Sequence, residues 1–366
     1  MMEAKRLIGL ATQWLLARVL RYDLMLLTIV MCLITVGFIT LFSAGYSFPW
    51  RIEDQMRNII VALTAMFIVS FVPIRWVRKV SVAAFAAGCL LLLATELVGV
   101  TVKGATRWLD IGVRIQPSEL AVPMMLAWYY WKRAEQTVWW DHLLALAILS
   151  VPVAFILKQP DLGTAILVSI AGLAVIFFAG INAKLVTACC AIGIALMPLL
   201  WTMLHDYQRE RILTLIDPTL DPLGKGFHTL QALIAIGSGG LSGKGWMEGT
   251  QAHLDFIPER TSDFIFAVFG EEFGFVGGVL LLILYLSLIA RSFYIAAHAR
   301  SRYARLLAAA IGVIFFTYSF VNIGMVSGIL PVVGVPLPFM SYGGTALLIL
   351  GICTGILLSI SVDAKD

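Results

Sequence analysis

Three segments of the 366-residue sequence combine ionisable side chains with glycine, proline or aromatic residues. They run from Gly104 to Glu119, from Lys158 to Thr164 and from Phe256 to Phe264, and each lies beside a long apolar run. A carboxylate inside or beside such a run is costly unless it has a partner, so it is a candidate functional group. Acids and bases gathered on one face favour acid–base chemistry there, whereas ion transport would place them along the interiors of the apolar runs.

Each of these acidic residues also has a structural interpretation. Glu119 and Asp161 would serve equally well as partners of nearby arginine or lysine side chains that lock helix ends. Asp263 would serve as the cap of the helix that follows it, because Asp near a helix N-terminus is favoured by capping and by the helix dipole. The residues alone leave these alternatives open.

Other kinds of site are poorly supported. The five cysteines fall inside apolar runs without a C-x-x-C pair, no two histidines have zinc-ligand spacing, and no Gly-x-Ser-x-Gly or Ser-x-x-Lys motif occurs. The glycine-rich stretch from Ile236 to Trp246 is not a P-loop, because Gly245 follows Lys244 and Ser238 occupies the first glycine position. Its flexible backbone is still suited to a close approach to a phosphate or a sugar.

The composition identifies lipid as the solvent for most of the chain. Hydrophobic residues make up 60% of the sequence and charged residues only 13%, whereas a soluble domain carries about 25% charged residues. A membrane-spanning helix needs about 20 apolar residues, and helices are the plausible spanning element in lipid. Ten apolar runs qualify, at 24–43, 58–73, 80–99, 117–131, 142–157, 163–180, 185–204, 273–290, 306–330 and 344–362. The predicted fold class is therefore an all-α polytopic membrane protein with about ten transmembrane helices.

The distribution of lysine and arginine predicts the orientation. Fifteen of the 26 basic residues lie at the termini and in every second connection, six lie in the alternate short connections, and five lie in one long loop between spans seven and eight. Because cytoplasmic loops are enriched in Lys and Arg, both termini are predicted to be cytoplasmic and the long loop periplasmic. The long loop has five basic and eight acidic residues, a balance of −3 that argues against nucleic-acid binding.

The predicted organisation has five parts. Residues 1–22 form a cytoplasmic amphipathic segment, read as uncleaved because no small-x-small cleavage site follows its apolar stretch. Residues 23–204 hold spans one to seven, 205–263 the large periplasmic loop, 264–362 spans eight to ten, and 363–366 a cytoplasmic tail. Prolines at 331, 336 and 338 predict a broken, non-helical segment before the last span.

Ordered motifs extend through nearly the whole chain. They are Arg107-Trp-Leu-Asp110, Gln116-Pro-Ser-Glu119, Gln159-Pro-Asp-Leu-Gly-Thr164, His205-Asp-Tyr-Gln-Arg209, Asp221-Pro-Leu-Gly224, Ile236-Gly-Ser-Gly-Gly240, Gly243-Lys-Gly-Trp246, Gly249-Thr-Gln251, Ile257-Pro-Glu-Arg-Thr-Ser-Asp-Phe-Ile265, Asn322-Ile-Gly-Met325, Leu330-Pro-Val-Val-Gly-Val-Pro-Leu-Pro338 and Ser341-Tyr-Gly-Gly344. In these motifs the sequence resembles the SEDS family (shape, elongation, division and sporulation). The Gly-Lys-Gly-Trp and Gly-Thr-Gln pieces are similar to its RodA-like elongation branch.

The resemblance implies a peptidoglycan glycosyltransferase of the bacterial cytoplasmic (inner) membrane, which polymerises lipid II during cell elongation and rod-shape maintenance. It implies a class B penicillin-binding protein as the transpeptidase partner, together with lipid II, other elongation-complex membrane proteins and membrane lipids. No nucleic acid is expected among the partners. The family's essential external aspartate corresponds to Asp263.

Acid–base logic then assigns roles. The 4-hydroxyl of an acceptor sugar is a weak nucleophile, so a carboxylate within hydrogen-bond reach is needed to take its proton, and Asp263 is the predicted catalytic base. The departing diphosphate needs cationic stabilisation. A divalent cation, Mg or Mn, is the candidate cofactor, with no metal ligands assigned and no organic cofactor expected. The predicted substrate-binding residues are Arg107, Arg209, Arg211, Lys225, Glu119, Asp161 and Lys158.

Two other functions stay open, and one motif departs from the family. A lipid II flippase would need a charged, hydrated route between the leaflets, and a non-catalytic scaffold for a penicillin-binding protein would tolerate substitution of Asp263. Family members usually carry a lysine shortly after the Gln-Pro-Ser-Glu motif, whereas Glu119-Leu-Ala-Val-Pro123 has none. In family members that lysine would face Asp161. Without it, Asp161 is expected either to pair with Lys158 or to be neutral, because burial disfavours the charged form of a carboxyl group.

Overall fold

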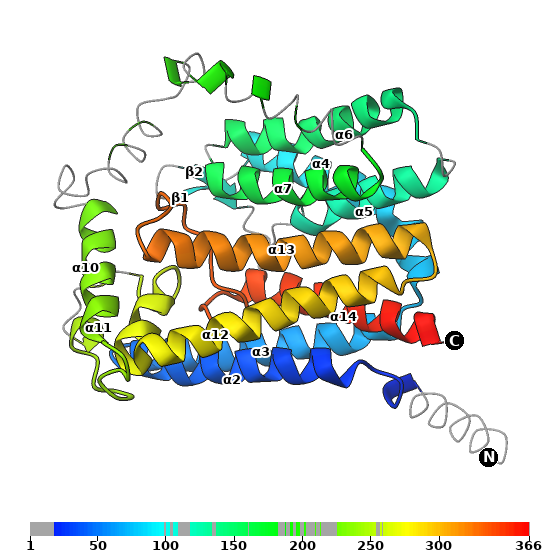
Figure 1. Cartoon of the computed structure of the whole chain (residues 1–366). Helices are drawn as coiled ribbons and strands as arrows, with labels where there is room; N and C mark the ends of the chain where they lie inside the picture. Colours follow the sequence, from blue (N-terminus) through cyan, green and yellow to red (C-terminus); the bar gives the residue numbers. More distant parts are fainter. Residues whose placement is uncertain are drawn as a thin grey trace.

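The computed structural model describes residues 18–98, 100–102, 105–108, 118–133, 137–159, 161–181, 225–253, 257 and 259–365, with a few separate positions between 187 and 213. Over these residues the chain forms a bundle of long helices (Figure 1). The helices are α2 (Leu24–Ala44), α3 (Pro49–Ser70), α4 (Ile74–Val98), α5 (Ser118–Lys132), α6 (Trp139–Lys158), α7 (Leu162–Phe178), α10 (Lys225–Ser238), α11 (Thr250–His253), α12 (Ile265–Ala297), α13 (Arg302–Val326) and α14 (Gly344–Lys365).

Long apolar helices identify the chain as a multi-pass membrane protein. Within the described ranges, six helices are long and apolar enough to cross a membrane, namely α2, α4, α6, α12, α13 and α14, and α7 is a shorter apolar helix. The predicted apolar runs coincide with described helices except for the run at 185–204, most of which falls outside the described residues. The helical fold class is therefore confirmed, and the count of ten spans stays a prediction.

The helices form two groups joined by α13. Helix α2 packs on α12 and α3 packs on α14, while α4, α5, α6 and α7 pack on one another; α13 contacts α12 on one side and α5 and α7 on the other (Figure 1). Helices α13 and α14 are the most buried of these six helices, each with 78% of an 18-residue apolar stretch buried inside the protein. The core therefore lies around α13 and α14, and the site described below opens where these helices meet.

One short hairpin interrupts the helical pattern. Strand β1 (Val100–Val102) pairs antiparallel with β2 (Ala105–Trp108) in the connection between α4 and α5. This hairpin was not predicted from the sequence. The Val-Thr-Val composition of β1 suits a strand, but strands of three and four residues are too short to give a readable alternation.

Helix α12 is broken near its start, beside the glycine-rich stretch. Gly274 has φ 64° and ψ −163°, so two helices meet at this residue. A Cβ on Gly274 would lie 2.2 Å from the backbone nitrogen of Gly243, and a Cβ on Gly243 would lie 2.0 Å from the carbonyl oxygen of Glu272. The backbone nitrogen of Lys244 donates to Glu271 O at 3.0 Å across this contact. Gly243 and Gly274 thus serve close packing of backbone on backbone, and the approach of the glycine-rich stretch to a phosphate or a sugar stays a prediction.

The two ends of the described chain lie together at the opposite end of the bundle from α10 and α11 (Figure 1). Lys365 Nζ donates to the carbonyl oxygen of Arg21 at 2.9 Å. Nearby, the Asp23 carboxylate caps α2 by accepting from Leu26 N at 3.0 Å, and it also pairs with Arg291 of α12 at 2.6 Å. The residues that lead into α2 are therefore fixed to both α12 and α14 at this end.

Candidate active site

Asp263 lies in a turn that leads directly into α12. The turn is closed by hydrogen bonds from Ser262 N at 3.0 Å and Phe264 N at 3.3 Å, both to Glu259 O, and Glu259 has a φ of 53°. The N-cap of α12 is Phe264, and no side-chain hydrogen bond caps the helix. The interpretation of Asp263 as the helix cap is therefore wrong, and its side chain is half-buried.

A buried arginine anchors this turn to the connection between α2 and α3. The Arg260 side chain is only 6% exposed. Its Nε donates to Ala44 O at 2.8 Å, and its Nη2 donates to Ser47 Oγ at 3.2 Å. Hydrogen bonds to charged groups are among the stronger ones in proteins, so the turn is fixed relative to the end of α2.

The broken segment between α13 and α14 holds the turn from the other side. Asn322 Nδ2, on α13, donates to Asp263 O at 2.8 Å and to Val335 O at 2.7 Å. Ser341 Oγ donates to Ser262 O at 2.6 Å. The predicted non-helical segment is confirmed between Val326 and Gly344, and its role is to form a wall beside Asp263.

Glycine 334 sets how closely that wall approaches the carboxylate. It has a φ of 78°, and a Cβ on this residue would lie 3.2 Å from Asp263 Oδ2. A positive φ favours glycine because other residues are strained there. Gly334 thus keeps one side of the Asp263 carboxylate open.

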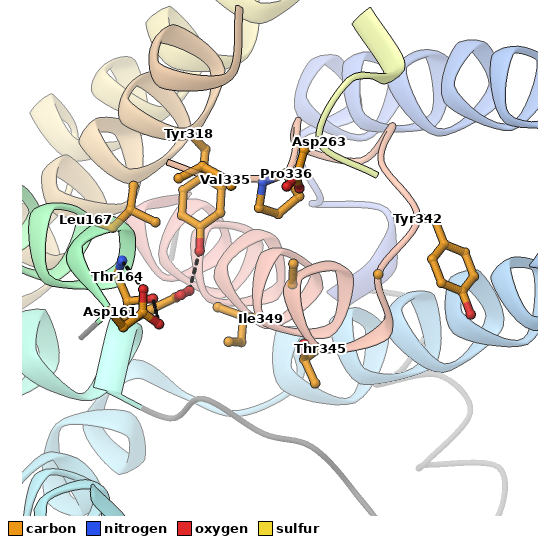
Figure 2. A pocket seen from close by; sticks show the side chains of 14 residues that line it. Asp161, Thr164, Leu167, Asp263, Tyr318, Val335, Pro336, Tyr342, Thr345 and Ile349 are labelled. Atoms are coloured by element: carbon orange, nitrogen blue, oxygen red, sulfur yellow. Dashed lines mark hydrogen bonds between the residues drawn. The ribbon is translucent and has the colours of Figure 1, made fainter. Parts of the chain in front are cut away.

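Asp263, Glu119 and Asp161 line a single cavity of about 210 Å³. These three residues come from segments far apart in the sequence, and all three were predicted as site residues. Figure 2 shows Asp263 next to Pro336 at one side of the cavity and Asp161 at the other. The other residues of the lining are Thr164, Leu167, Tyr318, Gly334, Val335, Pro336, Tyr342, Gly343, Thr345, Ala346 and Ile349.

The Glu119 carboxylate is held by a tyrosine that the sequence analysis did not single out. Glu119 lies in the first turn of α5 and is 7% exposed, and the hydroxyl of Tyr318 on α13 donates to its Oε2 (Figure 2). A buried carboxylate needs such a donor, because an unsatisfied polar group is costly. The only sequence signal for Tyr318 is a phenol hydroxyl within an apolar run, which is also common in packed cores.

Asp161 caps α7. Its Oδ1 accepts from Thr164 N at 3.2 Å and its Oδ2 accepts from Thr164 Oγ1 at 2.9 Å. Both carboxylate oxygens therefore have donors from the same helix turn, which gives this buried residue a way to stay satisfied without the family's lysine. The prediction that Lys158 replaces that lysine stays a prediction.

The described lining of the cavity is acidic, with three carboxylates and no Lys or Arg. Among the predicted cationic residues, Arg209 donates to Trp201 O at 3.1 Å and Thr202 O at 2.7 Å, and Lys158 is exposed at the end of α6. Arg107 lies on β2 and Lys225 begins α10, but their side chains, and all of Arg211, lie outside the described residues. The structure therefore brings the predicted carboxylates together, and the roles of the predicted cations stay predictions.

Comparison with known proteins identifies the family. The family model FTSW_RODA_SPOVE, described as "Cell cycle protein", matches residues 15–366. The chain belongs to the FtsW/RodA/SpoVE family. Within this family it is 44% identical to "Peptidoglycan glycosyltransferase MrdB" of Escherichia coli K12 over 348 residues, which cover 94% of each chain. The predicted resemblance to the RodA-like branch is confirmed.

Solved structures of the FtsW/RodA/SpoVE family share the fold. A chain from "Structural coordination of polymerization and crosslinking by a peptidoglycan synthase complex" is 30% identical with a TM-score of 0.82, and the match covers 94% of this chain and 99% of that one. The Thermus thermophilus rod shape determining protein RodA is 28% identical with a TM-score of 0.71, and the match covers 94% and 98% of the two chains. The likeness therefore covers nearly the full length of the bundle.

Proposed function

We propose that this protein, a peptidoglycan glycosyltransferase of the cell-elongation type, polymerises lipid II at the cavity beside Asp263. The observation that carries the proposal is the convergence of Asp263, Glu119 and Asp161 on one cavity. It supports acid–base chemistry at one end of the bundle, where the start of α12 and the end of α13 meet (Figure 1). A purely structural set of carboxylates would be expected to close on partners without leaving a cavity.

Asp263 acts as the general base in this mechanism. The 4-hydroxyl oxygen of the acceptor sugar forms a bond to the anomeric carbon of the donor, while the bond from that carbon to the diphosphate oxygen breaks. The hydroxyl proton passes to the Asp263 carboxylate, and the undecaprenyl diphosphate leaves as an anion. Proton transfer by a positioned carboxylate contributes about 10²–10⁴-fold to the rate. The hydrogen bond from Asn322 to the backbone of Asp263 supports this role because it fixes the position of the base.

The other polar groups of the cavity bind saccharide. Glu119 and Asp161 lie buried on the wall opposite Asp263, each with a donor from Tyr318 or Thr164. Their remaining lone pairs are suited to accept hydrogen bonds from sugar hydroxyls. Arg107, Arg209, Arg211, Lys225 and Lys158 stay the candidates for binding the diphosphate, which needs positive charge that the described lining does not supply.

A divalent cation fits this site only when it is shared with the substrate. Within the described residues no three His, Cys, Asp or Glu side chains are grouped closely enough to hold a metal ion. Magnesium is commonly held by one or two carboxylates together with substrate phosphates, and Asp263 offers such a ligand. A bound cation would supply charge neutralisation to the leaving diphosphate.

The membrane topology and the partner belong to the same proposal. Ten spans in the inner membrane would place 1–22 and 363–366 in the cytoplasm and 205–263 in the periplasm, with spans one to seven in 23–204 and eight to ten in 264–362. The contact between Lys365 and Arg21 supports termini on one side. The likeness to a chain of a peptidoglycan synthase complex supports a class B penicillin-binding protein as the partner that cross-links the strands.

The test is polymerisation of labelled lipid II by the purified full chain with its transpeptidase partner. Asp263→Asn should remove glycan polymer while leaving partner binding intact, and Glu259→Gln, an exposed carboxylate of the same turn, is the matched control. Polymer from the Asp263→Asn protein would refute the catalytic role of Asp263. Translocation of lipid II across vesicles without any polymer from the native protein would instead support the flippase, and full function of Asp263→Asn in cells would support the scaffold.

A further inference from the structure

A group of aromatic rings surrounds one arginine at the start of α3. The Arg51 guanidinium carbon lies 4.9 Å from the ring centre of Phe48, 5.2 Å from that of Trp50 and 5.7 Å from that of Tyr342. The Trp50 and Tyr342 rings are edge to face, 6.5 Å apart at 88°. We call Trp50, Arg51 and Tyr342 the Trp50 platform. Stacking on a cation and T-shaped packing both restrict ring motion, so the platform is a preorganised surface.

The platform is attached to the turn that carries Asp263. Arg51 Nη1 donates to Thr261 Oγ1 at 2.5 Å, and the backbone nitrogen of Tyr342 donates to Thr261 O at 2.8 Å. Tyr342 also lines the same cavity as Asp263 (Figure 2). The platform therefore continues the wall of the cavity outward from the proposed catalytic base.

Helix α3 fixes the segment on which Tyr342 lies. Gln55 is 2% exposed; its Nε2 donates to Ser341 O at 3.1 Å, and its Oε1 accepts from Gly343 N at 3.3 Å. One amide side chain thus holds the residues on both sides of Tyr342. The separation between the Trp50 ring and the cavity is set by packing rather than by a flexible loop.

The exposure and chemistry of the platform suit a sugar ligand. Trp50 is 53% exposed, so its ring is accessible to a ligand. The C–H faces of a pyranose pack on aromatic rings, a guanidinium donates to its hydroxyls, and a phenol oxygen accepts from them. Burial, with a smaller effect of the hydrogen-bonded Asp54, raises the pKa of Tyr342. Arg51 Nε is buried without a hydrogen-bond partner within the described residues.

We propose that Trp50, with Arg51 and Tyr342, forms a saccharide subsite that binds a pyranose ring beside the Asp263 cavity. This inference rests on the proposed function, because it assumes that the substrate of the cavity is a glycan. The pyranose belongs either to the growing strand or to the lipid-linked precursor. The competing explanation is that Trp50 is only an aromatic anchor at the membrane interface, where Trp is enriched.

The test compares Trp50→Leu and Trp50→Phe with a control on another exposed tryptophan. Trp246 is 49% exposed and packs on Phe42, and it does not line the cavity, so Trp246→Leu removes an exposed ring of similar kind away from the site. KM, kcat and glycan length are measured with labelled lipid II and the partner present. Trp50→Leu should change KM or strand length about five- to tenfold, the size of one lost aromatic contact. Trp50→Phe, which keeps a smaller ring, should give intermediate values, and Trp246→Leu should stay near the native values.

The direction of the defect identifies the bound sugar. A raised KM with native strand length assigns the platform to the precursor, and shortened strands with native KM assign it to the growing glycan. Native KM and strand length in Trp50→Leu, or equal losses in Trp50→Leu and Trp246→Leu, would overturn the subsite.

Binding of labelled lipid II to each variant separates this inference from the proposed function. A native protein that binds but never polymerises refutes the function. In that case, weakened lipid II binding by the Trp50→Leu protein would still support the saccharide subsite. Native lipid II binding by the same variant would refute it.

Discussion

Two carboxylates near the start of α12 lie in different environments, and different roles are proposed for them. Glu271 is fully buried; its carboxylate pairs with Lys244 Nζ at 2.7 Å and accepts from Thr250 Oγ1 at 3.1 Å and Gln251 N at 3.0 Å. Asp263 is half-buried, and the hydrogen bond from Asn322 goes to its backbone carbonyl. The fixed backbone of Asp263, with its carboxylate lining a cavity, suits the proposed role of a base. The donors around the Glu271 carboxylate suit a role in stabilising the fold.

The strongest test of this difference is a matched pair of isosteric changes. Asp263→Asn should lower kcat by about 10²–10⁴-fold, because an amide cannot take a proton, with little change in thermal unfolding in detergent. Glu271→Gln should instead lower the unfolding midpoint, because Lys244 loses its ionic partner. Lipid II polymerisation and thermal unfolding, measured on both proteins, check the prediction. A stable but inactive Glu271→Gln protein would show that Glu271 takes part in chemistry.

Truncating the buried ion pair should have the next largest effect. Glu271→Ala leaves the partly buried Lys244 charge without its carboxylate and Gln251 N without its acceptor, which should destabilise the protein by about 3 kcal/mol. The double variant Glu271→Ala with Lys244→Met should recover part of that loss, because no partly buried charge is left behind. Denaturant or thermal unfolding of the two proteins provides the comparison, and equal stability of both would contradict the pairing.

A glycine change tests the backbone contact that supports Glu271. Gly243→Ala would place a Cβ 2.0 Å from Glu272 O at a φ of 82°. The glycine-rich segment must then move away from α12, which should lower the free energy of unfolding by about 2 kcal/mol. Gly237→Ala is the control, because a Cβ there meets no atom within 4 Å. Reduced stability of Gly243→Ala alone, measured by thermal unfolding, is the expected result, and similar behaviour of both variants would refute the close-packing role.

The smallest effect is expected on the far wall of the cavity. Tyr318→Phe removes the hydroxyl that donates to Glu119, which should cost about 1 kcal/mol of stability and raise KM a few-fold without changing the order of magnitude of kcat. The control is Tyr294→Phe, since Tyr294 is 50% exposed on α12. Kinetics with labelled lipid II and thermal unfolding check this prediction. A drop in kcat as large as that of Asp263→Asn would place Tyr318 in the chemistry itself.

The sequence predicts the helices and the carboxylates better than it predicts their partners. Apolar runs identify helices because a span requires a long stretch of one composition, and the three prolines near residue 336 identify the broken segment for a local backbone reason. The pairing of Glu119 with Tyr318 joins residues 199 positions apart, and no local pattern encodes it. The glycines at 243 and 274 could not be assigned to packing because each requires a neighbour that only the fold supplies.

The two hydrogen bonds from Asn322 Nδ2 make the width of the cavity a property of α13. One nitrogen atom spans from the carbonyl of Asp263 to that of Val335, so the turn and the proline-containing wall cannot separate unless at least one bond breaks. A ligand that needs the turn and this wall further apart would therefore have to offset the energy of that bond.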